Sequence, residues 1–409
     1  MRRTLPSSAR ALRHHNYRLW AGADLVSVTG SWMQVLGLNW VVMERTGSAT
    51  AVGFSVLAGT LPALLAGPWA GALADRYDPR RIIVAGQSVH VALALLLALL
   101  VWVGTPLATL YALTALSGLV TAIEGPALGR FGAQVVPPDD LPNALALGSL
   151  VNSAGRVLGM SLAGVLAAAV GEPVLFLVNA VTFLAVVSTV RAVRVGELHP
   201  LAVSPPERAG MRAGLAHVRR NHTLLTLFAL GFVLSSLGRN YQVTMAAMAS
   251  GPLGAGAEGY GLLSAVFAVG AVLGGLVAAR LRTLGPPVLI AAAGITSLLQ
   301  AVSGLMPGLV GFAALILAIA AGAVVIDTVM GTRVQFDSAE DMRGRVLSVH
   351  AAVAASPGTV GGPLLGWMCE GLGPGAALVA AGLVTLAVTG CAAAALSVSR
   401  VPRGSLREA

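Results

Sequence analysis

Five ionisable residues interrupt the long apolar stretches of this chain: Asp24, Glu124, Arg156, Arg239 and Asp327. A charge at the centre of an apolar helix costs about 2.5–3.5 kcal/mol on insertion scales, so each of the five needs a reason to be there. Carboxylates whose solvation changes can exchange protons, and arginines bind anionic groups through a planar, bidentate fork. The five residues therefore indicate the handling of protons or solutes.

Small polar residues accompany these charges at helical spacing. Asp24, Ser27, Ser31 and Gln34 are separated by three, four and three positions, and Thr114, Ser117, Thr121 and Glu124 repeat that spacing. A shorter series, Ser236, Asn240 and Thr244, lies beside Arg239. Residues three or four apart share one helical face. Each series therefore predicts a polar stripe that faces a cavity rather than lipid.

Arg156 and Arg239 leave two interpretations open. They could bind a carboxylate or catecholate group of a substrate, since the guanidinium is a planar, bidentate donor. They could instead pair with backbone carbonyl groups inside the helix packing. His90 and His350 are expected to be packed polar groups without a role in proton transfer.

Composition defines the elements that must hold these residues. The chain is 56% hydrophobic and 11% charged, whereas soluble domains carry about a quarter charged residues. Apolar runs of at least about 17 residues predict transmembrane helices. Twelve such runs are expected, near 19–43, 49–74, 82–103, 106–130, 143–170, 173–191, 222–248, 259–281, 286–305, 308–332, 344–369 and 375–398.

Several classes of activity are excluded by what the chain lacks. All 26 basic residues are Arg, so there is no Lys for a P-loop or for a Schiff base. No nucleophile–base pair and no His/Cys metal set can be recognised, and we expect neither an enzyme nor a cofactor. Energy for any transport would come from an ion or substrate gradient rather than from ATP.

The distribution of arginine predicts the topology. Arginines precede the first expected helix and follow the second and the sixth, while the opposite loops carry mainly acids. By the positive-inside rule, both termini are cytoplasmic in a cell (inner) membrane. The net charge of +9 then reflects the arginines on the cytoplasmic side and does not indicate a nucleic-acid-binding surface.

In this orientation Asp24, Glu124 and Asp327 all lie about 9 Å below the inner surface. We expect them to line the inner half of one aqueous cavity, where at least one exchanges a proton. The alternative is that each bonds a neighbouring helix.

A polar segment divides the chain into two halves of six helices. The expected organisation is a basic cytoplasmic terminus at 1–18, bundles at 19–192 and 222–398, a linker at 193–221 and a tail at 399–409. Within the linker, 207–220 is amphipathic and predicts a helix on the membrane surface, with a partner-binding helix as the alternative. The halves look like parallel repeats, because 134–143 and 335–344 share Gln and Asp at one spacing.

Residues 71–81, GALADRYDPRR, resemble the loop between the second and third helices of the major facilitator superfamily. Four further segments resemble its enterobactin-exporter-like branch: EGPALGRF at 124–131, NALALGSLVNSAGRVLG at 143–159, RNYQVTM at 239–245 and RGRVLSV at 343–349. The chain departs from the family pattern at Asp78, Leu128, Met160 and Ala279.

The resemblance implies an all-α membrane protein whose two six-helix bundles surround a central cavity and alternate in access. It also implies a cytoplasmic latch formed by Gly71, Asp75, Arg76, Arg80 and Arg81, with Asp75 capping the helix expected at 344–369. The alternative is that these charges only anchor a short loop at the lipid headgroups. The predicted function is proton-coupled export of a small molecule such as a siderophore, an antibiotic or another metabolite. An importer, or a non-transporting membrane sensor on the same fold, is the alternative. The expected partners are the substrate, protons and the lipid bilayer.

Overall fold

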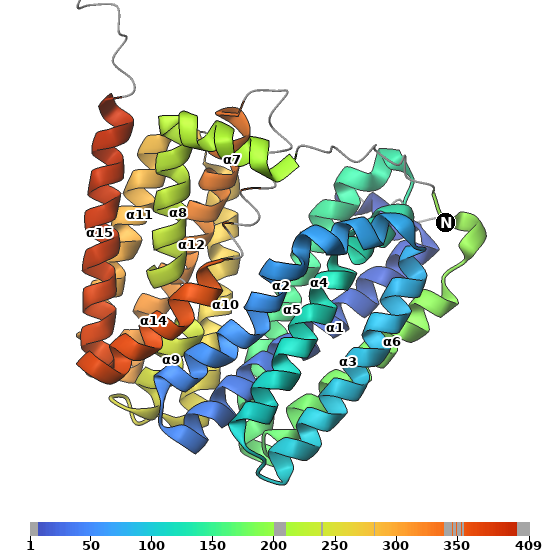
Figure 1. The fold of residues 1–409 in the computed structure, drawn as a ribbon, viewed down its shortest axis with the longest axis horizontal. Helices are drawn as coiled ribbons and strands as arrows, with labels where there is room; N and C mark the ends of the chain where they lie inside the picture. The colour runs from blue at the N-terminus through green and yellow to red at the C-terminus, as the bar shows by residue number, and fades with distance from the viewer. Residues whose placement is uncertain are drawn as a thin grey trace, which may run out of the picture. The chain divides into compact units, whose positions relative to one another are not determined.

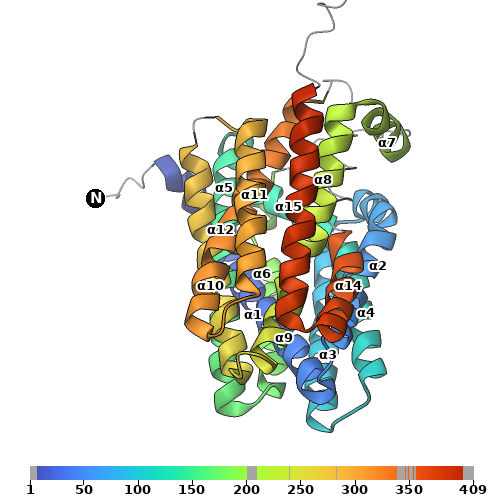
Figure 2. The same ribbon diagram turned by 90° about the vertical axis from the view of Figure 1, so that its left-hand side faces the viewer.

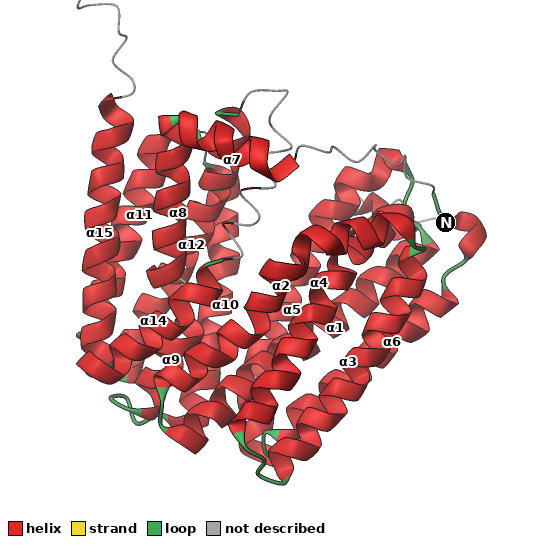
Figure 3. Ribbon diagram, in the orientation of Figure 1, coloured by secondary structure: helices red, strands yellow, loops and turns green. Residues whose placement is uncertain are grey.

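The computed structural model describes residues 7–199, 210–238, 240–281, 283–338, 346, 349, 353 and 356–398. All regular elements in these ranges are helices (Figure 3), which confirms the predicted all-α class. The chain forms two compact units. The first unit comprises Met1–Gly47, Phe54–Pro205 and Gly256–Ala265, and the second comprises Ser48–Gly53, Pro206–Ala255 and Val266–Ala409.

Six long helices build most of the first unit (Figure 1). They are α1 (His15–Thr46), α2 (Ala49–Arg76), α3 (Pro79–Trp102), α4 (Leu107–Gln134), α5 (Leu141–Val170) and α6 (Pro173–Ala192), with short 3-10 turns at Ser7–Arg13, Pro138–Asp140 and Val195–Glu197. Gly47 ends α1 in the left-handed region at φ 61°, where glycine carries no Cβ penalty. Asp78 begins α3, because its carboxylate accepts the N–H of Arg80 and Pro79 fits the first helical position.

The second unit contains the remaining helices, seen from a second side in Figure 2. They are α7 (Gly210–Arg220), α8 (His222–Gly238), α9 (Tyr241–Ser250), α10 (Gly256–Arg280), α11 (Pro286–Ser303), α12 (Leu309–Phe336), α14 (Pro357–Leu372) and α15 (Pro374–Val398). The first turns of α2 belong to this unit, and the first turns of α10 belong to the first unit.

Eleven helices of the described residues are long and apolar enough to cross a membrane. The sequence predicted twelve. The remaining one, expected at 344–369, is described continuously only from residue 356, where α14 begins at Pro357. The expected boundaries otherwise agree closely with the structure, for example 173–191 against α6 at Pro173–Ala192.

One expected helix is interrupted. The stretch 222–248 was predicted as a single helix, but the structure has α8 and α9, and Asn240 between them is not helical. The side-chain amide of Asn240 donates to the carbonyl of Ser236 at 2.9 Å. Asparagine competes in this way with backbone hydrogen bonds, and Gly238 just before it weakens the helix further. The interruption thus has a local cause in the sequence.

Close helix contact in the first unit depends on glycine. A Cβ at Gly159 of α5 would lie 2.4 Å from the carbonyl oxygen of Thr29 and 2.8 Å from Cβ of Trp32, both on α1. A Cβ at Gly155 would lie 2.8 Å from Cγ1 of Val28. Small residues allow membrane helices to approach this closely. Gly155 and Gly159 therefore allow α5 to pack closely on α1.

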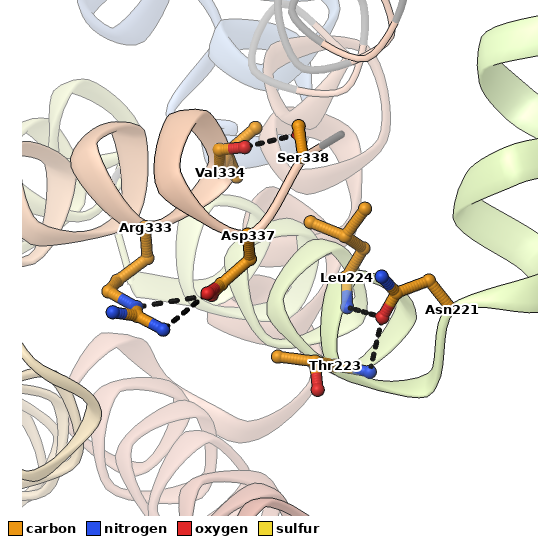
Figure 4. Close-up of polar contacts among 7 residues, drawn as sticks. All are labelled: Asn221, Thr223, Leu224, Arg333, Val334, Asp337 and Ser338. Carbon is orange, nitrogen blue, oxygen red and sulfur yellow. Dashed lines mark hydrogen bonds and ion pairs between the residues drawn. The ribbon is translucent and has the colours of Figure 1, made fainter. Parts of the chain in front are cut away.

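The segment of predicted amphipathic character contains α7, which lies across the ends of α8 and α12 in the second unit (Figure 1). Val218 of α7 is buried with Leu224, Phe228 and Val334. Figure 4 shows how this end of the unit is held by polar contacts. Asn221 Oδ1 accepts the N–H groups of Thr223 and Leu224 at 3.0 and 3.2 Å, which caps the start of α8.

Candidate functional site

A buried carboxylate and imidazole meet between α3 and α4 of the first unit. His90 Nε2 lies 3.2 Å from Glu124 Oε1, and the Gln87 amide donates to the same oxygen at 2.8 Å. Glu124 is 2% exposed and His90 is 4% exposed. A buried carboxylate needs a charged or hydrogen-bonding partner, and here two side chains one helical turn apart on α3 supply it.

Further contacts hold the imidazole ring of His90. Ser117 Oγ lies 3.2 Å from Nδ1 and Thr121 Oγ1 lies 3.4 Å from Nε2, while the ring stacks on Phe183 of α6 with 4.9 Å between centroids. One tautomer satisfies the shorter contacts: Nε2–H donates to Glu124, and Nδ1 accepts from Ser117. We call Gln87, His90, Ser117, Thr121 and Glu124 the α3–α4 polar cluster.

Two buried oxygen atoms of the cluster lack a hydrogen-bond partner among the described residues, Gln87 Oε1 and Glu124 Oε2. Glu124 Oε2 is buried and makes no hydrogen bond within the described part of the chain. It points at Gly86, where an added Cβ would lie 2.1 Å away. The absence of a side chain at residue 86 therefore leaves the space that the Glu124 carboxyl group occupies. A proton arriving at the cluster has an unoccupied acceptor at Oε2.

Asp24 stands elsewhere in the first unit. It lines a cavity of about 350 Å³ between α1, α4 and α5, together with Tyr17, Ser149 and Asn152. We call this the α1 cavity. A space of this volume is within the range of small-molecule sites, about 300–1,000 Å³.

The rest of the α1 stripe lies among neighbouring helices. Ser27 and Ser31 are half-buried, and Gln34 Oε1 accepts from the Asn179 amide of α6 at 2.8 Å. Arg156 of α5 places its guanidinium 6.0 Å from the ring centre of Trp32 on α1, a cation–π distance. Its Nε is buried without a hydrogen-bond partner among the described residues. Both interpretations of Arg156, substrate binding and packing, stay predictions.

Asp327 belongs to the second unit. It is exposed and lines a cavity of about 180 Å³ between α8, α11 and α12. We call this the α12 cavity. Its polar wall contains Ser235, Ser297 and Gln300, all of them buried. The sequence analysis singled out Asp327 but none of these three.

The predicted stripe on residues 236–244 faces α14. A Cβ at Gly361 of α14 would lie 2.1 Å from the Ser236 carbonyl oxygen and 2.3 Å from Asn240 Nδ2. Ser235, one position earlier, reaches the α12 cavity instead. Arg239, a predicted substrate-cavity residue, lies outside the described residues.

The predicted latch residues are spread over the end of α2 and the start of α3. Arg76 and Arg81 are exposed, and Arg80 donates to the Val190 carbonyl of α6 at 3.2 Å. Gly71 and Asp75 fall within α2, but only their place in the helix is described, and most residues of 339–355 lie outside the described ranges. The latch stays a prediction.

A carboxylate in the second unit, Glu370 in the last turn of α14, binds the start of α2. It accepts the Ser48 hydroxyl, and the Thr50 N–H at 3.1 Å. The Ser48 hydroxyl, helped by the hydroxyl and N–H of Thr50, lowers the pKa of Glu370 against a smaller opposing effect of burial. Helix N-termini stabilise negative charge in this way.

The sequence found Glu124 but not its partner. His90 was expected to be packed and inert, and Gln87 was not considered. The signal was present, because Gln87 and His90 are three apart and so share a face of α3, as do Ser117, Thr121 and Glu124 on α4. Which faces meet could not be read from spacing alone.

Apolar helices of spanning length, with polar groups buried between them, are typical of an integral membrane protein. The model of the family described as transmembrane secretion effector matches residues 7–406, and the chain belongs to this family of the major facilitator superfamily. It is therefore a multi-pass membrane protein, as the resemblance predicted.

Two curated relatives are similar over part of the chain. The staphyloferrin A transporter of Staphylococcus aureus is 24% identical over 260 residues, which is 61% of this chain and 63% of that protein. The macrolide efflux protein A of Streptococcus pyogenes is 23% identical over 218 residues, 53% of this chain and 54% of that protein. The chain thus matches less than two thirds of the length of each.

Solved structures share the fold. The nucleoside transporter NupG superposes with a TM-score of 0.75 at 11% identity, covering 93% of this chain and 99% of that one. A bacterial homologue of the iron transporter ferroportin, in an inward-facing state, gives 0.71 at 17% identity, covering 93% and 98%. At such identities the likeness establishes the fold alone.

Proposed function

We propose that this protein exports a small molecule across the cell membrane against inward proton flow, and that Glu124 and His90 carry the proton. The observation that carries the proposal is the buried pair, with 3.2 Å between His90 Nε2 and Glu124 Oε1. Export is supported by the name of one relative, a macrolide efflux protein, and transport of a small molecule by the name of the other, a staphyloferrin A transporter. A siderophore or macrolide-like metabolite is the proposed class of substrate.

The pair couples proton binding to the exclusion of water. With Glu124 ionised and His90 neutral, the cluster carries one negative charge. A proton added at Glu124 Oε2 or at His90 Nδ1 makes it neutral overall. Moving a net charge out of water costs far more free energy than moving a neutral group. The protonated cluster therefore suits a fully packed state, whereas release of the proton requires access to water.

Few other ionisable groups surround the pair. In the sequence of α6, which carries Phe183, the only one is Arg191 in the last turn. On α1, Asp24 lines the α1 cavity. Proton exchange is thus assigned to the pair as a unit, because the His90 ring and the Glu124 carboxylate are in direct contact. Asp24 is proposed as a polar wall of the substrate path.

The remaining features of the proposal follow the sequence analysis. Both termini and the 193–221 linker are placed on the cytoplasmic side, and the bundles at 19–192 and 222–398 alternate in access. Gly71, Asp75, Arg76, Arg80 and Arg81 would close the cytoplasmic side. The arginine distribution and the family resemblance support these assignments.

Transport in everted vesicles tests the proposal. A pH gradient is imposed without ATP, and accumulation of a labelled macrolide and a labelled siderophore is compared for the wild type, Glu124→Gln and His90→Gln. Glu172→Gln, outside the cluster, is the matched control. Both cluster variants should lose gradient-driven accumulation, at least tenfold, yet retain exchange of labelled for unlabelled substrate. Wild-type accumulation by both cluster variants would refute the assignment.

A second measurement needs no substrate. Infrared difference spectra between two pH values should show a protonated carboxyl band that Glu124→Gln removes and Glu172→Gln leaves in place. A band that survives Glu124→Gln would assign the proton to another residue.

A further inference from the structure

Two charges of opposite sign stand on neighbouring helices of the first unit without compensation. Asp24 of α1 is half-buried, and neither a hydrogen bond nor an ion pair joins its carboxylate to another described residue. Arg156 of α5 is half-buried as well, and its guanidinium has no such bond within the described ranges. Charged side chains inside a membrane span are costly and usually face a partner or the path of a solute. A ligand with two charges would supply both partners.

The polar groups around Asp24 do not neutralise it. The Tyr17 hydroxyl donates to the Ala144 carbonyl at 2.8 Å. The Ser149 hydroxyl donates to the Leu145 carbonyl at 3.1 Å. Both hydroxyl protons are therefore taken by the backbone of α5. No arginine or histidine is among the described residues that line the α1 cavity, so the carboxylate has no counter-charge there.

The two helices that carry these charges, α1 and α5, lie side by side in the first unit (Figure 1). Gly155 lies against Val28, and Gly159 lies against Trp32. Residue numbers therefore rise together along the two helices. We call this contact the α1–α5 seam. A position further along α1 lies opposite a position further along α5.

Arg156 stands further along the seam than Asp24. Ser149, Asn152 and Arg156 are three and four positions apart, so they share one face of α5. Because Ser149 and Asn152 line the α1 cavity, Arg156 continues that wall one turn, or about 6 Å, further on. Its guanidinium lies 6.0 Å from the ring centre of Trp32, a residue two turns, or about 12 Å, beyond Asp24 on α1. The carboxylate and the guanidinium are therefore separated along the seam by roughly 6–12 Å.

We propose that the α1–α5 seam binds a dipolar organic molecule, with its protonated amine at Asp24 and its carboxylate at Arg156. The α1 cavity, with about 350 Å³, holds the amine end, where the side-chain oxygen of Asn152 accepts a second hydrogen bond from the ammonium group. The guanidinium offers a carboxylate two parallel N–H donors.

One ligand of this class compensates both charges of the seam. The ammonium and the carboxylate each meet a charge of opposite sign, so neither end of the ligand leaves a net charge out of water. A molecule with only one charge would leave the other protein charge uncompensated. This inference rests on the proposed transport function, because it names the chemical class of what is carried.

Equilibrium binding to the purified, full-length protein in lipid nanodiscs tests the site without a gradient. The probe is 4′-(aminomethyl)biphenyl-4-carboxylate, a rigid molecule with an ammonium group at one end and a carboxylate at the other. Its methyl ester keeps only the ammonium, and its N-acetyl derivative keeps only the carboxylate. Isothermal titration calorimetry, with empty nanodiscs as background, should show saturable binding of the dipolar probe, at least about tenfold tighter than that of either derivative. Equal affinity for all three compounds, or no saturable binding, would overturn the proposal.

Variants assign each charge of the probe to one residue. Asp24→Asn should weaken binding of the dipolar probe about tenfold, yet leave the N-acetyl derivative unchanged, because that derivative carries no ammonium group. Arg156→Gln should weaken the dipolar probe to a similar extent and leave the methyl ester unchanged. A merely structural role of either residue would weaken all three compounds alike. That result in folded variants, or unchanged affinity for the dipolar probe, would overturn the assignment.

A cavity-filling variant locates the amine end. Gly148 lines the α1 cavity, and a Cβ at this position would meet nothing within 4 Å. Gly148→Leu should therefore fill the cavity and weaken the dipolar probe and its methyl ester by more than about tenfold. Glu172→Gln and Arg191→Gln, which remove charges outside the cavity, should leave all affinities unchanged, and thermal unfolding shows that each variant is folded. Unchanged binding in folded Gly148→Leu would place the probe elsewhere and overturn the assignment.

Two combinations of results separate this inference from the proposed function. Failure of proton-driven transport in the vesicle experiment, with charge-selective binding intact, would refute the proton assignment alone. Proton-driven accumulation in the wild type, together with equal binding of the dipolar probe and its two derivatives, would refute the dipolar site alone.

Discussion

Each unit carries a carboxylate within an expected membrane span, Glu124 in the first and Asp327 in the second, and their surroundings differ. Glu124 is 2% exposed, and Gln87 and His90 both contact its Oε1. Asp327 is exposed and borders a cavity of about 180 Å³. In the first unit polar side chains contact one another in a packed interior, an arrangement suited to storing a proton. In the second they face open space, an arrangement suited to a ligand. Predictions of stability can test this contrast.

The largest expected effect is on the buried pair. Replacing His90 with Ala leaves Glu124 buried with only Gln87 and removes the ring that stacks on Phe183. Breaking a buried pair in this way costs about 3–5 kcal/mol. Asp327→Asn, which removes an exposed charge, should cost less than about 1 kcal/mol. Thermal unfolding in detergent micelles measures both, and equal losses would remove the contrast.

Filling space should act with opposite sign in the two units. Ala94 of α3 is 1% exposed and packs with Ala180 and Phe183, so Ala94→Leu should destabilise by about 1–3 kcal/mol through overpacking. Ala323 lines the α12 cavity. Ala323→Leu should therefore raise stability by about 1 kcal/mol, a usual gain for filling a cavity. The unfolding midpoint of Ala94→Leu should therefore fall below that of the wild type, and the midpoint of Ala323→Leu should rise above it. A fall for both variants would mean that the second unit has no usable space.

Single methyl groups give a finer comparison. Gly86→Ala brings Cβ to 2.1 Å from Glu124 Oε2, so the carboxylate must leave Gln87 or His90, at a cost of about 1–2 kcal/mol. Gly231→Ala on the α12 cavity meets only the flexible end of Met330, at 3.4 Å. That variant should gain about 0.5–1 kcal/mol from helix propensity. If Gly86→Ala unfolds at the same temperature as the wild type, the Glu124 carboxylate has space in another direction.

The smallest effect concerns Glu370, an exposed carboxylate whose hydrogen bonds with Ser48 and Thr50 lower its pKa below the ordinary 4.5. A lowered pKa contributes stability above the unfolded-state value, and that contribution disappears as the pH falls through the folded-state value. Because the group is exposed, Glu370→Gln should cost less than about 0.5 kcal/mol at pH 7. The difference from wild type should diminish as the pH falls below 4.5 and through the lowered folded-state pKa of Glu370. Unfolding curves at pH 4 and pH 7 measure it, and a difference that persists at low pH would point to a cause other than charge.

Much of the fold could be predicted from the sequence because a membrane imposes simple rules. Apolar length defines a span, so helices such as α6 were located to within a residue or so. The interruption between α8 and α9 was missed, since Asn240 and Gly238 do not lower the apolar character of the stretch enough to divide it. The competition of the Asn240 amide with the backbone becomes visible only in three dimensions.

The candidate site was predicted less completely. A buried charge is conspicuous in an apolar sequence, so Glu124 and Asp327 could be selected. Helical spacing also grouped Ser117 and Thr121 with Glu124. Spacing cannot say which neighbouring helix a stripe will face, and so His90 was set aside. For the same reason Ser236 was predicted to face a cavity, whereas its neighbour Ser235 is the residue that lines the α12 cavity. Rotation of one helix against another is decided by packing.

The room left by Gly86 has a consequence for how this site can change during evolution. With Oε2 2.1 Å from a potential Cβ, residues 86 and 124 cannot vary independently. Any side chain at 86 favours a shorter residue at 124, and a protein that has lost Glu124 no longer needs glycine opposite it. Among related sequences the two positions should therefore co-vary. Glycine at 86 would then mark the relatives that have kept a full-length carboxylate at this depth, even where overall identity is low.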